Sequence, residues 1–358
     1  MLSGRSVWQA HASCGQWPTP ASSTESEPVS DTSGPNIAVI GGGTGSFTLL
    51  QALKNYTSTL NAVVNMSDDG GSTGTLRDEY GVLPPGDIRQ CLVALSQFKQ
   101  ARDLFNYRFD SGTLDGHAFG NLFLTAAEKM TGSFTDGIAL AETLLATSGH
   151  VIPITCQNVT LSAHTSDGTV INGEYNVATR DFHGERPTLT LTPTARINKA
   201  AAAAIADADL VVIAPGHLYG SLAPALIVNG VAGALARTSA PVVFVCNLVT
   251  KPGQTDQFCV TDFADEIERF IGAPALDYVL YNTRLPDDDL LAAYAAAGEH
   301  AVAVTGETAE RHWTPVGTPL LADTLATPAS GDALAASRSL IRHDPDRTAR
   351  ALMRLYFS

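Results

Sequence analysis

The feature that most constrains the fold is a glycine-rich loop that directly follows a short, wholly apolar segment. Residues 37–40 read Ile-Ala-Val-Ile, and residues 41–46 continue as Gly-Gly-Gly-Thr-Gly-Ser. A short apolar run that ends at a turn signal is typical of a strand buried on both faces of a parallel sheet. Apolar residues then recur at helical spacing between Phe47 and Leu53. The sequence therefore predicts a strand, a tight turn and a helix, which open an α/β fold.

The same alternation of strand and helix extends along most of the chain. Residues 62–64 predict a second strand, residues 67–86 a glycine- and aspartate-rich loop, and residues 87–147 an insertion of four helices. Residues 159–165 and 169–177 flank Ser-Asp-Gly, a strong β-hairpin signal. Further helices are predicted over residues 195–206, 223–236, 261–271, 290–297 and 348–356, and further strands over residues 210–214, 242–246, 278–281 and 301–304. This order predicts a mostly parallel sheet covered by helices.

Composition and charge exclude several classes of protein. The chain carries 36 acidic against 22 basic residues, a formal net charge of −14, whereas a general nucleic-acid binder needs a basic face. Its five cysteines are widely spaced without a Cys-x-x-Cys pair, so we expect neither a disulfide framework nor a zinc site, and a reducing cytoplasm suits them. The most apolar stretch, residues 200–214, contains Asp207 and Asp209, which argues against a membrane span. The sequence leaves the oligomeric state open, including a homodimer.

The beginning of the chain differs from the rest in composition. Residues 22–35 are polar, rich in serine and proline, and aperiodic. Such a segment cannot bury enough apolar surface to offset the entropy of ordering. We therefore expect residues 1–35 to form a disordered tail and residues 36–358 to form a single α/β domain.

Two loops that follow predicted strands are candidates for binding phosphate. Residues 41–46 and 214–221 are rich in small and hydroxyl side chains, and each loop precedes a predicted helix. Glycines let a backbone approach a phosphate closely, and the free N–H groups at a helix start attract its charge. The first loop lacks the Lys-Ser/Thr pair of a P-loop and the third glycine of a dinucleotide fingerprint. A tight turn that needs small residues is the alternative.

The loop after the second strand carries adjacent carboxylates, Asp68 and Asp69, among glycines and hydroxyl residues. Neighbouring carboxylates can bind Mg²⁺, directly or through water, beside a diphosphate. A lone aspartate about 20 residues past a glycine loop can instead bind a ribose hydroxyl. Aspartate and glycine are also ordinary turn residues, so a solvated turn is the third interpretation.

Three further clusters are less distinctive when each is read alone. Asp87 and Arg89 open a predicted helix, the first most simply as an N-cap and the second as an exposed or phosphate-pairing cation. His117 and Asn121 open another helix and could bind a ligand group, although most such pairs are structural. Lys251, in the loop after a later strand, is a candidate diphosphate partner or a solvated side chain. Several such loops fit one nucleotide cleft better than unrelated turns.

Taken in order, these loops resemble the bacterial gluconeogenesis factor (YvcK-like) proteins, which share a superfamily with 2-phospho-L-lactate transferase (CofD). The resemblance runs from residue 36 to the C-terminus and rests on residues 41–45, 68–74, 76–81, 84–89, 116–121, 215–221 and 245–255. It implies a Rossmann-like three-layer α/β sandwich with a mostly parallel sheet, a helical insertion, a β-hairpin and a nucleotide cleft. His217 departs from the family pattern, because a smaller residue is expected there.

The resemblance also implies a function. The expected protein is a cytoplasmic one that binds a nucleotide diphosphate, either a UDP-sugar or a GDP-type molecule, and that is linked to carbon metabolism and cell-shape regulation. The alternative is a Mg²⁺-dependent 2-phospho-L-lactate transferase-like enzyme that uses a nucleotide-diphosphate donor. An NAD-dependent dehydrogenase is a weaker alternative, because the third glycine is missing.

The residues expected to act fall into four groups. The nucleotide and its phosphates would contact Gly42, Gly43, Thr44, Gly45, Ser46, Gly216, Leu218, Tyr219, Ser221, Asn247 and Thr250. His117 and Asn121 would bind the distal group, and Asp68 and Asp69 would hold Mg²⁺. If the chain is an enzyme, Asp87 and Arg89 would act in catalysis.

Overall fold

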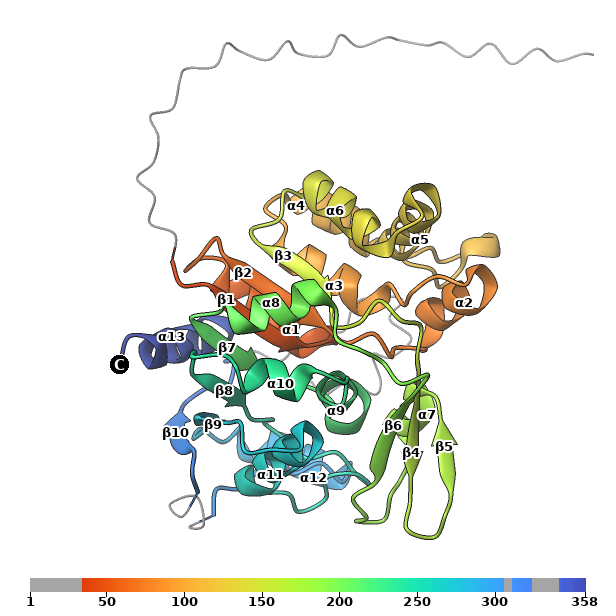
Figure 1. Ribbon diagram of the computed structural model, residues 1–358. Coiled ribbons are helices and arrows are strands. Elements are labelled where there is room, and N and C mark those ends of the chain that lie inside the picture. The colour runs from red at the N-terminus through yellow and green to blue at the C-terminus, as the bar shows by residue number, and fades with distance from the viewer. Residues whose placement is uncertain (1–33, 306–310, 324–340) are drawn as a thin grey trace, which may run out of the picture. The chain divides into compact units, whose positions relative to one another are not determined.

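The computed structural model describes residues 34–305, 311–323 and 341–358. Within this part of the chain, one parallel sheet has the strand order β10-β9-β8-β7-β1-β2-β3 (Figure 1). Its strands are β1 (Ile37–Gly41), β2 (Leu60–Val64), β3 (His150–Pro153), β7 (Leu210–Ile213), β8 (Val242–Val245), β9 (Tyr278–Asn282) and β10 (Thr314–Thr318). The sheet confirms the predicted α/β fold class.

The strand order places a topological switch point in the middle of the sheet. The chain adds β2 and β3 on one side of β1, and it later returns to add β7 to β10 on the other side. Ile37 of β1 lies opposite Leu60 of β2 and opposite Leu210 of β7. In open α/β sheets, ligands bind in the crevice beyond the carboxyl ends of the strands at such a point.

Burial on both faces explains why the central strands read as continuous apolar runs. Every residue of β1, β7 and β8 is buried, because helices cover the sheet (Figure 1). Outside the insertion, and apart from a short helix that belongs to the second sheet, the described helices are α1 (Gly43–Leu53), α8 (Lys199–Ala206), α9 (Ala223–Leu226), α10 (Val231–Leu235), α11 (Val260–Ile271), α12 (Asp288–Ala296) and α13 (Pro345–Tyr356), with the π-helical turn η2 (Leu218–Leu222) before α9.

The predicted helical insertion between β2 and β3 is confirmed. Its elements are α2 (Gly71–Tyr80), α3 (Gly86–Leu95), α4 (Lys99–Asn106), the short 3₁₀ helix η1 (Gly112–Leu114), α5 (Phe119–Thr131) and α6 (Phe134–Leu145). The helix α3 packs against α1 of the main layer, and α5 packs against both α4 and α6. The insertion is therefore joined to the main layer through α3, and α6 adds contacts with β3.

A second, antiparallel sheet follows the insertion, with the strand order β5-β4-β6. Its strands are β4 (Thr160–His164), β5 (Val170–Asn172) and β6 (Thr188–Thr192), and the short helix α7 (Glu174–Thr179) follows β5. The predicted hairpin is confirmed, because His164 of β4 pairs with Val170 of β5 across the Ser-Asp-Gly turn. At this turn the Asp167 carboxylate accepts hydrogen bonds from the Thr165 hydroxyl and the Thr169 N–H.

The prediction of a loop over residues 67–86 was wrong, because this segment contains α2. Two glycines within this helix disfavour helix formation in isolation. Packing decides otherwise, since Thr73, Gly74 and Leu76 are buried on one face. Gly74 lies so close to the preceding loop that a Cβ there would fall 2.1 Å from the Asp69 carbonyl oxygen. Tertiary contacts rather than propensity therefore form this helix.

Other differences concern short elements. The second arm of the hairpin is only three residues long, and the chain then turns into α7. The helix predicted over residues 223–236 is interrupted at Gly230, which adopts a φ of +105°. Residues 301–304 form isolated bridges rather than a strand. The strands β3, β6 and β10 were not predicted.

Residues 1–33 of the predicted disordered tail lie outside the described residues. In the part of the chain that the structure describes, no helix combines the length and the apolar character needed to cross a membrane. Cys91, Cys156, Cys246 and Cys259 are free thiols there.

Candidate functional site

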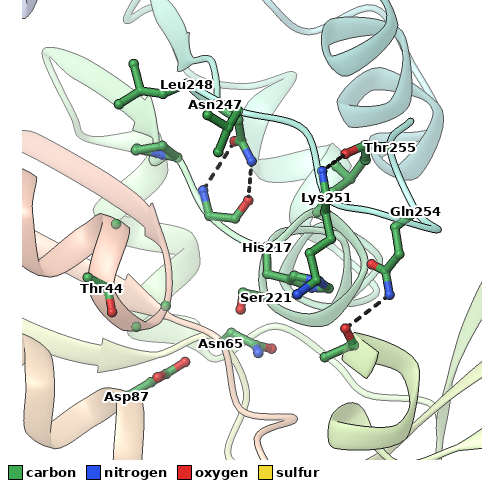
Figure 2. A pocket seen from close by; sticks show the side chains of 18 of the residues that line it. Thr44, Asn65, Asp87, His217, Ser221, Asn247, Leu248, Lys251, Gln254 and Thr255 are labelled. Carbon is green, nitrogen blue, oxygen red and sulfur yellow. Dashed lines mark hydrogen bonds between the residues drawn. The ribbon is translucent and has the colours of Figure 1, made fainter. Parts of the chain in front are cut away.

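A cavity of about 390 Å³ lies at the switch point of the sheet. It is lined by the loops that follow β1, β2, β7 and β8, by the start of α3, by α7 and by residues 341–343. Figure 2 shows side chains from these separate segments around one hollow, among them Thr44, Asp87, Ser221 and Lys251. Segments far apart in the sequence therefore meet at the place where the topology predicts a ligand.

The loop between β1 and α1 forms one wall of the cavity with its backbone. Gly42 is the N-cap of α1 and provides no side-chain cap, and Gly43 and Thr44 continue the wall. A Cβ on Gly42 would fall 2.3 Å from Asp87 Oδ2, so the absence of a side chain lets this carboxylate lie against the helix start. A Cβ on Gly45 would fall 1.7 Å from the Pro215 carbonyl oxygen. The loops after β1 and β7 are therefore in direct contact.

The loop after β7 is held in place by the loop after β8. The Asn247 amide nitrogen donates to the Gly216 carbonyl at 2.9 Å, and its amide oxygen accepts from the Gly216 N–H at 3.4 Å (Figure 2). Leu218 and Ser221 line the cavity together with Gly216 and Asn247. Tyr219, by contrast, packs its ring in the core, edge-on to Phe182 and Phe270.

The loop after β8 contributes Lys251, whose ammonium group points into the cavity (Figure 2). Thr250 also lines the cavity, and its hydroxyl accepts a hydrogen bond from the His300 N–H at 3.0 Å. Close by, Glu299 lines the cavity, and its Oε2 atom is buried without a hydrogen-bond partner among the described residues. The cavity therefore offers a cation, Lys251, on the wall opposite the helix start of α1.

Besides Glu299, three further carboxylates line the same cavity: Asp68, Asp87 and Glu174. Burial raises the pKa of Asp68, against hydrogen bonds from the Gly70 N–H and the Thr73 hydroxyl that lower it. Burial also raises the pKa of Glu174 well above its usual value, and repulsion from Asp68, Asp87 and Asp69 raises it further. The acidic wall is therefore an unfavourable environment for a dianionic diphosphate unless a proton or a cation is bound there.

Asp69 does not share this wall with Asp68. Its two carboxylate oxygens accept the N–H groups of Glu174 at 3.0 Å and Tyr175 at 2.8 Å, at the start of α7. At the other end of α7, the Gln254 amide nitrogen lies within hydrogen-bond distance of the carbonyl oxygens of Val177, Ala178 and Arg180. Both ends of α7 are thus held by loops of the main sheet. Among the described residues, no group of three His, Cys, Asp or Glu side chains could hold a metal ion alone.

Arg89, His117 and Asn121 meet outside the lining of this cavity. The Arg89 Nε donates to Asn121 Oδ1 at 3.0 Å, and Asn121 Nδ2 donates to the Ser72 hydroxyl at 3.3 Å. His117 Nδ1 lies 3.0 Å from the same hydroxyl. The Arg89 guanidinium also donates to Asn106 Oδ1. This polar cluster joins α2, α3, α4 and α5, and Arg89 itself is buried.

The structure therefore brings together most of the residues expected at the site. Eleven of them line the cavity: Gly42, Gly43, Thr44, Gly45, Asp68, Asp87, Gly216, Leu218, Ser221, Asn247 and Thr250. Six lie elsewhere: Ser46, Asp69, Arg89, His117, Asn121 and Tyr219. Glu174 and Gln254 were missed; Glu174 was assigned to a hairpin arm, and no local pattern marks either side chain.

The raised pKa of Glu174 leads to a testable stability effect. Between the unfolded pKa of a glutamate and the higher folded pKa, the folded state binds a proton that the unfolded state has lost, so stability falls as pH rises. We expect Glu174→Gln to raise the melting temperature by a few degrees at about pH 8 and to have progressively less effect toward about pH 4.5. Melting curves at several pH values test this, with Glu79→Gln on the exposed face of α2 as the control. A Glu174→Gln variant less stable than the wild type at pH 8 would contradict it.

A parallel sheet with a cavity at its switch point, lined in part by charged side chains, defines an α/β protein with the topology that suits ligand binding. Comparison with known families then identifies which one. Residues 37–321 match the family described as 2-phospho-L-lactate transferase CofD, and the chain belongs to this family.

Relatives within the family carry gluconeogenesis-factor names. A Nostoc sp. protein with the provisional name gluconeogenesis factor is 40% identical over 327 residues, which cover 90% of this chain and 69% of that protein. The gluconeogenesis factor of Listeria monocytogenes is 39% identical over 260 residues, which cover 72% of this chain and 80% of that protein. A crystal structure of a UPF0052 family member from Bacillus halodurans superposes with a TM-score of 0.81 at 31% identity, covering 90% of this chain and 99% of that one. The predicted family and fold are confirmed.

Proposed function

We propose that this protein binds a nucleoside diphosphate of the UDP-sugar type in the switch-point cavity, and that in the cytoplasm it links this ligand to carbon metabolism and cell shape. The observation that carries the proposal is the meeting of two post-strand loops at one cavity. The loops after β1 and β7 touch through Gly45, and both open into the space that Lys251 also lines. Backbone N–H groups at a helix start and a lysine ammonium are complementary to a diphosphate.

We also propose that Mg²⁺ binds together with the nucleotide. Mg²⁺ is usually bound by one or two carboxylates together with substrate phosphates and water. Asp68 is the carboxylate of the expected pair that lines the cavity, whereas both oxygens of Asp69 are engaged by α7. A cation at Asp68 would also reduce the repulsion between a diphosphate and the carboxylates of Asp87 and Glu174.

Calorimetry with a nucleotide panel tests the function. The panel is UDP-N-acetylglucosamine, UDP-glucose, GDP and NAD, each titrated with Mg²⁺ and with a chelator. We expect a uridine nucleotide to bind with a dissociation constant well below about 1 mM, and more tightly when Mg²⁺ is present. Failure of both uridine nucleotides to bind would refute the proposal, and binding of NAD alone would favour the dehydrogenase alternative.

The placement of Asp87 favours a second candidate function, a transferase that uses a nucleotide-diphosphate donor. Asp87 lines the cavity at the first turn of α3 and lies against Gly42, beside the proposed phosphate position. A carboxylate there could orient an acceptor hydroxyl toward the donor. Release of nucleotide from the donor only when an acceptor alcohol is added would distinguish this enzyme from a protein that merely binds the nucleotide.

A further inference from the structure

Among the described residues that line the cavity, His217 is the one with a buried ring nitrogen that has no hydrogen-bond partner. It is the N-cap of η2, and its Nδ1 atom accepts the Gly220 N–H at 2.9 Å. Its Nε2 atom is buried and has no hydrogen-bond partner in the part of the chain that the structure describes. Buried polar atoms without a partner are rare in folded proteins, and each of them calls for an explanation.

The bond from Gly220 fixes the chemical form of the ring. A nitrogen that accepts a hydrogen bond carries no proton, so in the neutral imidazole the proton must be on Nε2. Burial and, to a smaller extent, the nearby Lys251 ammonium lower the pKa of His217 to about 4, so the ring is neutral at physiological pH. Nε2 is therefore an N–H donor for which the described residues provide no acceptor.

The neighbours of His217 show which kind of acceptor fits. The Lys251 side chain lies next to the His217 ring in the cavity, and Ser221 lies about one helical turn after His217 in η2 (Figure 2). Lys251 and the neutral ring of His217 are both donors, so neither can satisfy the other. An anionic oxygen placed between them would accept a hydrogen bond from each. The four-carbon stem of lysine is flexible, so Lys251 can shift to make room for this oxygen and still donate to it.

We propose that His217 binds the ligand directly, and that its Nε2–H donates a hydrogen bond to a diphosphate oxygen shared with Lys251. This inference rests on the proposed function and assigns a diphosphate contact to a residue that departs from the family pattern. In this arrangement Lys251 supplies the positive charge and His217 supplies a fixed direction, because its ring is held by Gly220.

His217→Asn is the sharpest test, because the asparagine oxygen can still cap η2 while the Nε2 donor is removed. Calorimetry would measure the affinity for UDP, and competition against UDP would measure the affinities for inorganic pyrophosphate and for uridine. We expect about a 10-fold weaker binding of UDP and of pyrophosphate, with uridine unchanged. His150→Asn, at the amino end of β3, is the control and should bind like the wild type.

The outcomes separate this inference from the proposed function. If the wild type binds no uridine nucleotide, the proposed function fails first. If the wild type binds UDP and His217→Asn binds it equally well, the inference is wrong; a loss that extends to uridine would place the contact on the nucleoside and also overturn it. Should the variant not fold, histidine ring ¹⁵N NMR of the wild type decides. We expect the Nε2–H form and a shift of its signal on saturation with UDP, whereas an unchanged signal would refute the contact.

Discussion

Gly45→Ala is expected to destabilise the protein by about 3 kcal/mol and to abolish measurable nucleotide binding. The new Cβ would fall 1.7 Å from the Pro215 carbonyl oxygen and 2.7 Å from its carbonyl carbon. Both atoms belong to the backbone, so relief requires the loops after β1 and β7 to separate. Because these two loops form adjoining walls of the cavity, their separation removes the proposed diphosphate position. Urea denaturation and calorimetry with UDP measure the two effects.

Gly233→Ala is the matched control for this substitution. Gly233 lies within the helix α10, and a Cβ there would meet the flexible end of Arg237 at 3.2 Å. A glycine-to-alanine change inside a helix is neutral or slightly stabilising when space allows. If Gly45→Ala is as stable as Gly233→Ala and binds UDP normally, the contact with Pro215 does not hold the cavity together.

Lys251→Met is expected to weaken UDP binding by about 10- to 100-fold while leaving the free energy of unfolding within about 0.5 kcal/mol of the wild type. The substitution keeps most of the aliphatic length and removes the ammonium that points into the cavity. A charge-assisted hydrogen bond to a phosphate is stronger than a neutral one, so its loss should exceed that of the His217 donor. Calorimetry at two salt concentrations checks this, because the lost interaction is electrostatic.

The control for the lysine is Lys199→Met at the exposed start of α8. It makes the same change in net charge without touching the cavity, so it should bind UDP like the wild type. Equal affinity in the two variants would show that Lys251 does not contact the ligand.

Sequence patterns predicted the central sheet well, because its strands are buried on both faces. The apolar runs of β1, β7 and β8 are read directly, and each ends in a glycine- or asparagine-containing loop. Peripheral strands carry weaker signals. β3 is four residues long and ends in proline, and β10 contains both a proline and a glycine. Their place in the sheet depends on pairing with distant strands, which the local pattern does not record.

At the site, the convergence of the loops could be predicted from the sequence, whereas the positions of individual side chains could not. Post-strand loops were predicted to converge because topology alone brings carboxyl ends of parallel strands to one edge. Which side chain enters the cavity depends on remote neighbours. Asp68 and Asp69 are adjacent in the sequence, and they are separated in space because α7, about a hundred residues later, uses Asp69 as its cap. Arg89 is likewise drawn to Asn121 and Asn106 rather than to the cavity.

The hydrogen bonds that hold α7 at both ends affect which parts of this fold can change in sequence and length. Asp69 anchors its first residues and Gln254 its last, so loops of the main sheet determine the position of Glu174 in the cavity lining. The β4–β5 hairpin that leads into the helix is therefore not needed to position Glu174. We therefore expect that insertions or deletions at its tip, around Asp167 and Gly168, would leave the position of Glu174 in the cavity wall unchanged.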